Sequence, residues 1–201
     1  MAESATPERR AATIFYAELR NFTRVSEVLP PEKVLALAND FFSLAAMSVT
    51  ANRGKVLSVQ NNMLVAAFGG HGATQLAERA LTSAQDVSRE FGTMGEEWKT
   101  AYGLPAAVSV ALHIGEAVFG MAGPIGARQF VAFGDCMDVA QRLVRRARSG
   151  ETVFSEDFIK ALGMRPAVIG ARQLPPLELA KRPPIALYGI TLEERLDFTR
   201  P

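Results

Sequence analysis

Apolar and polar residues along this chain change repeatedly between the spacing of strands and the spacing of helices. The apolar run at residues 12–19 has the length of a buried strand, and further strands are predicted at residues 107–113, 116–121, 130–133, 152–154 and 185–190. Residues 54–69 predict a β-hairpin with a two-residue turn at Asn61-Asn62, because asparagine tolerates the left-handed backbone that such a turn requires. After the turn, apolar residues fall on every second position, which is typical of a half-buried strand.

Two long segments have the spacing of amphipathic helices. The first begins near Pro31, since proline suits the first helical turn, and its apolar stripe faces either the core or a dimer partner. The second covers residues 75–98. A shorter helix is expected from its N-cap, Asp135, to about Arg148, and Ser155 has the position of the N-cap of a further short helix.

Strands that alternate with helices, together with adjacent hairpin strands, predict an α/β fold of the α+β type, in which helices cover a mixed sheet. A length of 201 residues suits one domain. We expect a flexible N-terminal lead at residues 1–11, the folded domain at residues 12–191 and a C-terminal tail at residues 192–201.

Composition narrows the classes of function. The 22 basic and 21 acidic residues give a formal net charge of +1, so binding of nucleic acid is not indicated. The one cysteine, Cys136, excludes an internal disulfide and a multi-cysteine metal cluster, and it favours a cytoplasmic location. No apolar run approaches the roughly 20 residues that cross a membrane, and residues 1–10 are too polar for a signal peptide.

Five segments resemble motifs of class III nucleotidyl cyclases, in the order of that family. They are YAELRNFT at residues 16–23, the hairpin at 54–69, HIGE at 113–116, FVAFGDCMDVAQRL at 130–143 and ELAKRPPIALYGI at 178–190. The family counterparts are FADIRGFT, DKFIGDGLMAVFG, IHTGE, YTVIGDTVNLAARL and LKGKSEPVRVYEV. The chain therefore resembles an adenylyl or guanylyl cyclase domain over about residues 12–191, and this resemblance implies a ferredoxin-like core.

The resemblance implies that two aspartates hold two divalent cations, Mg²⁺ or Mn²⁺, against a nucleoside triphosphate, so that the ribose hydroxyl can attack the first phosphorus. Glu18 and Asn62 stand at those positions. Asn62 offers a neutral oxygen, and hard cations bind more weakly as their ligands lose charge. We therefore expect poor metal affinity.

The positions implied for base recognition and for transition-state stabilisation are also changed, with one exception. Ser58 and Val131 stand at the base-recognition positions, and valine cannot form a hydrogen bond with a purine edge. Asp138 and Arg142 stand at the transition-state positions, and only Arg142 is unchanged. Since they are four residues apart on a helix, Asp138 can pair with Arg142 and screen its charge.

Two segments are implied to bind the phosphates. Backbone N–H groups around Asn21, Phe22 and Thr23 can cradle a phosphate, although Asn21 replaces the glycine of the motif. The lysine for the triphosphate tail aligns with Leu179, and Lys181 takes that role only if the alignment has a one-residue gap.

Some of these residues also have a purely structural interpretation. Taken alone, Glu18 is a carboxylate at a strand end, and Asp138 with Arg142 is a solvated helix pair worth about 0.3 to 0.5 kcal/mol. His113 falls in a predicted strand, where a buried histidine with its hydrogen bonds satisfied is the simpler interpretation than a metal ligand.

Three functions are consistent with this pattern. The first is a pseudocyclase, a homodimeric module that binds a nucleotide or another small ligand without turnover; in the family, metal ligands from one chain meet the helix residues of the other. The second is an active adenylyl or guanylyl cyclase that forms a 3′,5′-cyclic nucleotide and pyrophosphate, using Glu18 with Mn²⁺ or Mg²⁺. The third is a regulatory subunit that forms a heterodimer with an intact cyclase.

Overall fold

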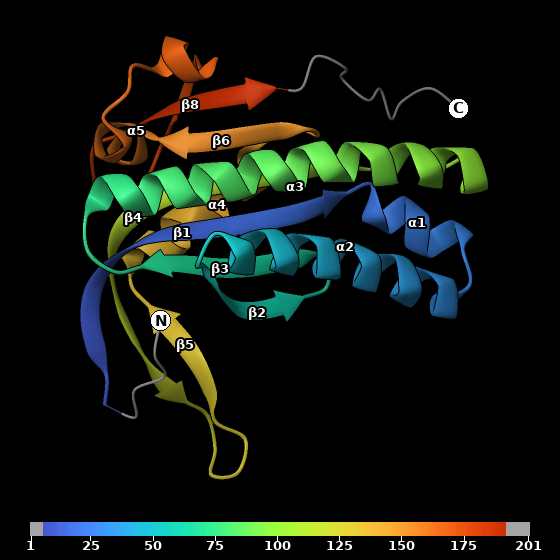
Figure 1. Cartoon of the computed structure of the whole chain (residues 1–201), viewed down its shortest axis with the longest axis horizontal. Coiled ribbons are helices and arrows are strands. Elements are labelled where there is room, and N and C mark those ends of the chain that lie inside the picture. Colours follow the sequence, from blue (N-terminus) through green and yellow to red (C-terminus); the bar gives the residue numbers. More distant parts are fainter. Residues whose placement is uncertain (1–5, 192–201) are drawn as a thin grey trace.

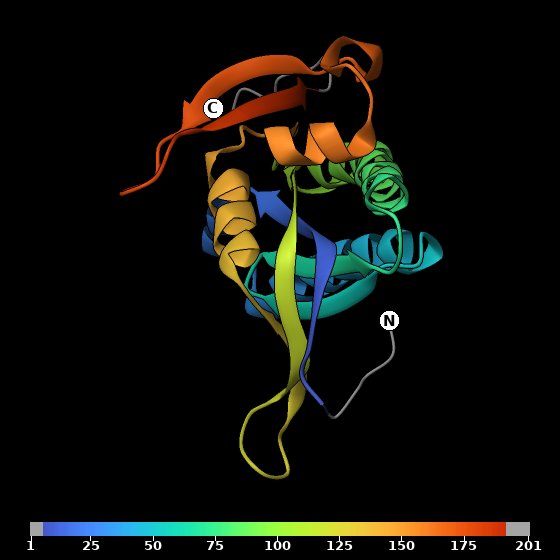
Figure 2. The same ribbon diagram turned by 90° about the vertical axis from the view of Figure 1, so that its left-hand side faces the viewer.

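The computed structural model describes residues 6–191, which form a mixed sheet between two layers of helices (Figures 1 and 2). The strands are β1 (Glu8–Arg20), β2 (Lys55–Gln60), β3 (Met63–Gly69), β4 (Ala107–Ala122), β5 (Gln129–Phe133), β6 (Glu151–Ser155), β7 (Arg172–Leu177) and β8 (Ile185–Thr191). Their order across the sheet is β2-β3-β1-β4-β6-β8-β7, and β5 pairs with β4 off this path. β4 and β6 are parallel, whereas β1 is antiparallel to both of its neighbours. The predicted fold class is confirmed.

Helices cover both faces of this sheet. They are α1 (Phe22–Val28), α2 (Pro31–Ala51), α3 (Ala73–Tyr102), α4 (Asp135–Arg146) and α5 (Glu156–Leu162), with a 3-10 turn η1 (Pro166–Ile169). The buried residues of α2, α3 and α5 share one core cluster, and those of α4 belong to a second cluster. Figure 2 shows α4 alone on its side of the sheet.

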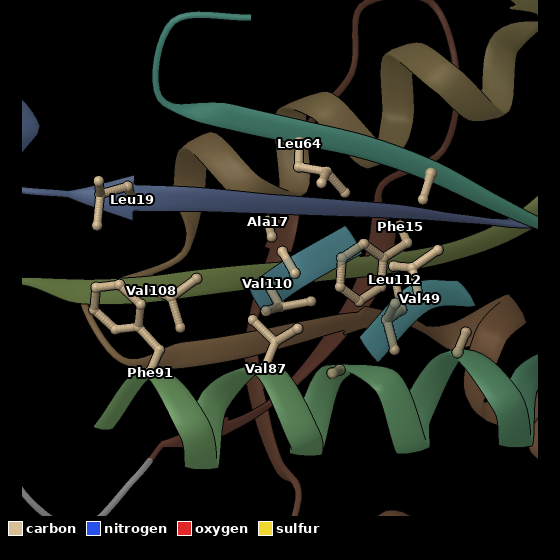
Figure 3. Packing of buried hydrophobic residues seen from close by; sticks show 14 of the residues in the cluster. Phe15, Ala17, Leu19, Val49, Leu64, Val87, Phe91, Val108, Val110 and Leu112 are labelled. Atoms are coloured by element: carbon tan, nitrogen blue, oxygen red, sulfur yellow. The ribbon is translucent and has the colours of Figure 1, made fainter. Parts of the chain in front are cut away.

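The central strands have two buried faces because apolar residues occupy consecutive positions. In β1, Phe15 and Ala17 belong to the cluster under α3, while Ile14 and Tyr16 belong to the cluster under α4. Figure 3 shows Phe15 and Ala17 on the side of the sheet from which Val87 and Phe91 of α3 approach.

The expectation of a half-buried strand after the hairpin turn is wrong for β3. Leu64, Ala66 and Phe68 lie in the cluster with α2 and α3, but Val65 and Ala67 are buried as well, in the cluster with α4. Alternate residues of a strand point to opposite faces, so β3 is covered on both sides. A continuous apolar run, rather than alternation of apolar and polar residues, is typical of a strand buried on both faces.

Several boundaries differ from the predicted ones. β1 begins at Glu8, so residues 8–11, expected in the N-terminal lead, continue the strand and pair with β4. β4 is one strand where two were predicted, and its second half forms with β5 a long hairpin that projects from the sheet (Figure 2). The helix predicted at residues 75–98 extends to both sides as α3. Residues 1–5 and the expected tail at residues 192–201 lie outside the described residues.

The helix starts were predicted with mixed success. Asp135 is the first residue of α4 rather than its N-cap, which is Gly134. That helix ends at Arg146, slightly before the predicted end. Ser155 is confirmed as the N-cap of α5, because its hydroxyl accepts a hydrogen bond from the Phe158 N–H at 3.2 Å.

The sequence analysis did not predict α1, η1 or β7. β7 contains Pro175 and Pro176, and proline cannot donate a hydrogen bond to a neighbouring strand. β7 nevertheless forms because it is the last strand of the sheet and has only one neighbour, β8.

α2 is the one described helix whose length and apolar composition would allow it to cross a membrane, although no such run was predicted. Its inward residues Leu37, Phe41 and Val49 are buried against the sheet and α3. A long apolar helix with one face in the core passes the same test of length and composition, so this observation alone is weak support for a membrane span.

Candidate functional site

Glu18 and Asn62 meet at one end of the sheet. Glu18 lies near the end of β1 opposite Met63, and Asn62 immediately precedes Met63 in the turn between β2 and β3. The predicted two-residue turn is confirmed, and Asn61 has the left-handed φ of 51° that asparagine tolerates. A backbone hydrogen bond from Leu19 N–H to Asn62 O, 2.8 Å long, joins the turn to β1.

The side-chain amide of Asn62 turns its nitrogen towards β1. Nδ2 donates to Leu19 O at 2.9 Å and lies 3.4 Å from Glu18 Oε1. A carbonyl oxygen can only accept, so the contact with Leu19 assigns Nδ2 rather than Oδ1 to this side. Asn62 therefore presents a hydrogen-bond donor to the carboxylate beside it.

Arg20 contacts the same carboxylate from β1 itself. Glu18 and Arg20 are two residues apart on a strand, which places both on the face covered by α4. An Nη2 nitrogen of Arg20 lies 3.2 Å from Glu18 Oε2, and the two side chains are only 19% and 15% exposed. Oε2 is buried and accepts no hydrogen bond within residues 6–191, so the contact is an ion pair rather than an aligned hydrogen bond.

The remaining contacts of Arg20 reach across the sheet to the end of α4. Nε donates to Ser109 Oγ at 2.9 Å, and Nη2 donates to Ala147 O at 2.8 Å and to Val144 O. Carbonyls at the C-terminal end of a helix lack helical partners and attract cations. Burial lowers the pKa of the Arg20 guanidinium, and the negative charge of Glu18 opposes that shift.

This donor set does not fit a pair of divalent cations. Mg²⁺ and Mn²⁺ require oxygen ligands, but here one carboxylate faces a guanidinium and an amide nitrogen. Nor does the described part of the chain contain a group of three or more His, Cys, Asp or Glu residues able to hold a metal ion.

The segment implied to cradle phosphate begins α1. Asn21 is its N-cap, with a left-handed φ of 62°, and its Nδ2 donates to Pro105 O at 2.6 Å. The left-handed backbone explains why asparagine can replace the motif glycine. Phe22 is partly buried against the core and Thr23 is exposed. As the first residues of the helix, both have N–H groups without a helical acceptor.

Asp138 and Arg142 lie on the exposed side of α4. The ion pair that their spacing allows is not formed: both side chains are exposed to solvent, and neither has an ion-pair partner in the described structure. Asp138 does influence Tyr16 of β1, whose pKa is raised first by burial and then by the negative charge of Asp138. α4 therefore lies along the face of β1 that carries Tyr16, Glu18 and Arg20.

Ser58 and Val131 lie half-buried on β2 and β5. A bulge in β2 pairs Lys55 with Ala67 and Ser58 with Val65, so these residues share a face although three positions separate them. The Lys55 ammonium lies 4.1 Å from the centre of the Phe130 ring, next to Val131. The sequence analysis missed this cation, because only the bulge turns it to the side of Ser58.

Lys181 is exposed in the loop between β7 and β8, with a left-handed φ of 65°. Leu179, which aligns with the family lysine, is 9% exposed and belongs to the core under α4. The neighbouring Arg182 contacts Asp135 at 2.6 Å, which places the loop at the N-terminal end of α4. Arg20 contacts the opposite end of that helix.

Within one chain the predicted residues therefore form separate groups. Glu18, Asn62 and the start of α1 gather at the end of β1, whereas Asp138 and Arg142 lie on α4. In the described residues no hydrogen bond or ion pair joins the two groups directly, and Arg20 is the side chain that contacts both Glu18 and α4. The sequence could have indicated the contact between Glu18 and Arg20, since residues i and i+2 of a strand share a face.

Comparisons with known proteins identify the family and the fold of this chain. A family model described as "Adenylate and Guanylate cyclase catalytic domain" matches residues 5–180. "Adenylate cyclase 1" of Rhizobium meliloti (strain 1021) is 30% identical over 137 residues, which is 67% of this chain but 20% of that relative. The chain thus spans about a fifth of the relative's length.

Two solved structures have the same fold. The crystal structure of the adenylyl cyclase CyaB from P. aeruginosa superposes with a TM-score of 0.85 and 19% identity, covering 94% of this chain and 98% of that one. The guanylyl cyclase Cya2 has a TM-score of 0.80 and 24% identity, with 90% and 92% covered.

Proposed function

Because this chain belongs to the family of class III adenylate and guanylate cyclase catalytic domains, we propose that it is a pseudocyclase, a dimeric binding or regulatory module in cyclic-nucleotide signalling. The observation that carries this proposal is the direction of the Asn62 amide. Its nitrogen lies 3.4 Å from Glu18 Oε1, where a second carboxylate would be required to hold a metal ion.

The charge balance at Glu18 supports loss of catalysis. Phosphoryl transfer in such enzymes depends on divalent cations that neutralise the triphosphate. Here Glu18 is the one carboxylate of the two expected positions, and Asn62 adds no negative charge. The position therefore attracts a dication far less than two carboxylates would.

Two groups that can bind a phosphorylated ligand without a metal ion remain in this chain. Arg142 is exposed on α4, and the first N–H groups of α1, at Phe22 and Thr23, have no helical acceptor. Both can meet phosphate oxygens without a metal ion. We propose a nucleotide or another small phosphorylated ligand as the bound species.

Dimer formation is part of the proposal, since the family resemblance implies a head-to-tail dimer. The projecting β4–β5 hairpin supports it, because Ile125 is 95% exposed near its tip and Phe133 is 65% exposed at its base. Large apolar side chains on a protruding hairpin favour a partner surface. A homodimer in the cytoplasm is the simplest assembly, and a heterodimer with an intact cyclase would use the same hairpin.

The deciding experiment measures cyclic nucleotide formation from ATP and from GTP, each with Mg²⁺ and with Mn²⁺. The chain, its Glu18→Ala variant and a Glu18→Asp, Asn62→Asp double variant are compared, with Glu27→Ala as an exposed carboxylate control. We expect no product from the native chain. Product from the native chain that disappears in Glu18→Ala but persists in Glu27→Ala would overturn the proposal in favour of an active cyclase.

Binding is measured separately from turnover. Titration calorimetry with non-hydrolysable analogues of ATP and GTP should detect binding that weakens in Arg142→Gln and is unaffected by Arg165→Gln, an exposed arginine of the turn before η1. Absence of binding by either analogue would leave the domain as a regulatory dimer without a nucleotide.

A further inference from the structure

The tip of the β4–β5 hairpin, residues 123–128, and a pocket between α1 and α2 have complementary surfaces. We propose that in a dimer the hairpin tip of each chain docks in this pocket of its partner, with Ile125 as the apolar anchor and Arg128 paired with Glu32. The inference rests on the dimer of the proposed function and deepens it, because it names the residues that the partner chain contributes.

The hairpin tip holds Ile125 in a defined position. A hydrogen bond of 3.0 Å from Ala127 N–H to Pro124 O closes a four-residue turn, and Gly126 has the positive φ, 87°, that the third residue of a type II turn requires. Ile125 is the second residue of this turn and is 95% exposed. A side chain presented by a closed turn needs little further ordering on binding, so Ile125 is suited to fill a pocket.

The pocket between α1 and α2 has the matching apolar character. Its cavity of about 360 Å³ lies where α1, the N-terminal half of α2 and the turn before β3 meet, and Ser26 and Asn61 are its polar lining residues. The apolar lining residues are Phe22, Pro31, Val34, Leu35, Ala38 and Phe42. Leu35 is 63% exposed, so within one chain the pocket leaves a large apolar side chain in water. An aliphatic side chain from a second chain would cover it.

The charges beside these two surfaces are opposite in sign. Arg128 of the hairpin tip is exposed and has no ion-pair partner within residues 6–191. Glu32, in the first turn of α2, is likewise exposed without an ion-pair partner in the described structure. Nearby, Glu27 already pairs with Arg24, and Lys33 lies over an aromatic ring. Glu32 is therefore the charge at the pocket that remains for Arg128.

One chain cannot bring its own hairpin tip to its own pocket. Glu8, at the start of β1, pairs with Phe119 at the foot of the hairpin, and Arg20, at the end of β1, precedes α1. The 13 residues of β1 separate the two places by about 40 Å. Figures 1 and 2 show the hairpin pointing away from the sheet. Two chains related by a two-fold axis can exchange their hairpins, which closes the assembly as a dimer with two equal contacts.

The test is site-directed cross-linking between chains. Ile125→Cys chains are mixed with Leu35→Cys chains and mildly oxidised, and each variant alone is a control because its new cysteine lies on one side of the contact only. Ile125→Cys mixed with Met47→Cys is the matched control, since Met47 is 70% exposed but lies about 18 Å further along α2 than Leu35. The native Cys136 is buried.

We expect a disulfide-linked dimer from the mixture of variants at positions 125 and 35, and none from the mixture at positions 125 and 47. A chain that is dimeric in sedimentation velocity but gives no link between positions 125 and 35 overturns the docking proposal and leaves the dimer in place. A monomeric chain overturns both. Product in the cyclase assay would overturn the pseudocyclase function without changing the cross-linking result.

Charge reversal tests the ion pair independently. Arg128→Glu and Glu32→Arg should each raise the dissociation constant of the dimer about fivefold, because each places two like charges side by side. The double variant should return to the native value, since the pair is formed again with its charges exchanged. Arg165→Glu is the control, because Arg165 is exposed just before η1. A double variant that dimerises no better than the single variants overturns the pairing of Arg128 with Glu32.

Discussion

Nδ1 of His113 lies 2.7 Å from Oγ of Ser155, and both side chains are buried. The Ser155 oxygen already accepts a hydrogen bond from Phe158 N–H, so its own proton is available for Nδ1. We assign Nδ1 as the acceptor and place the ring proton on Nε2, as the neutral tautomer requires. The prediction of a buried histidine with a satisfied hydrogen bond is confirmed for His113.

This pair leads to a prediction about pH. Burial lowers the pKa of His113, although Asp157 and Asp135 oppose the shift and Arg182 reinforces it. The unfolded chain therefore takes up a proton on His113 at a higher pH than the folded chain, so the free energy of unfolding should fall as pH drops below about 6.5. Urea unfolding between pH 8 and pH 5 measures this slope. It should flatten in His113→Gln and stay unchanged in His71→Gln, since His71 is exposed.

A second prediction concerns Asn62→Asp. The substitution replaces the nitrogen that donates to Leu19 O by an oxygen and places a second negative charge next to Glu18. We expect a loss of about 1–3 kcal/mol in unfolding free energy at pH 7 without metal ions. The adjacent Asn61→Asp is the control, because Asn61 is exposed and aspartate also tolerates a left-handed φ. Equal stability of the two variants would contradict the donor assignment at Asn62.

A third prediction addresses assembly. Ile125→Asp and Phe133→Asp should each shift the chain from dimer to monomer in sedimentation velocity, because they place a charge on the exposed apolar surface of the β4–β5 hairpin. Val168→Asp is the comparison, since Val168 is 64% exposed in η1, away from the hairpin. A dimer that resists both hairpin substitutions would mean that another surface holds the two chains together.

A fourth prediction tests the core under α3. Phe91 is 2% exposed and packs edge-to-face against Phe41 and Trp98, with ring centres 5.8 and 5.6 Å away. Phe91→Ala should lower the unfolding free energy by about 3–5 kcal/mol, because the cavity cannot be filled by rigid neighbours. Met47→Ala, at a 70% exposed position of α2, should change it by less than about 0.5 kcal/mol in denaturant titrations.

The sequence predicted those parts of the fold whose signal is local. The Asn61-Asn62 turn and the Ser155 cap depend on residues close in sequence, and both were found where they were predicted. Features set by neighbours across the sheet were missed. β7 was not predicted because its prolines are tolerated only at the sheet edge. β4 was predicted as two strands because Gly115 interrupts its apolar run.

The contacts of the candidate site also differ in whether they could be predicted from the sequence. The meeting of Glu18 with Asn62 could be predicted, since the family resemblance places both at the two metal-ligand positions. The contacts of Arg20 with Ser109 and Ala147 could not, because these residues are 89 and 127 positions away in sequence. The Asp138–Arg142 pair was allowed by spacing alone, and in the described structure both side chains are exposed without an ion-pair partner.

The two edge strands of the sheet, β7 and β2, also bear on how this protein avoids aggregation. An unpaired strand edge is a template for pairing with another chain. At one edge, β7 carries Pro175 and Pro176, which remove two N–H donors from the outermost strand. At the other edge, the bulge between Val56 and Ser58 interrupts the regular pairing of β2. Continued growth of the sheet from chain to chain is thus disfavoured at both edges, so association is directed towards side-chain surfaces instead of backbone pairing.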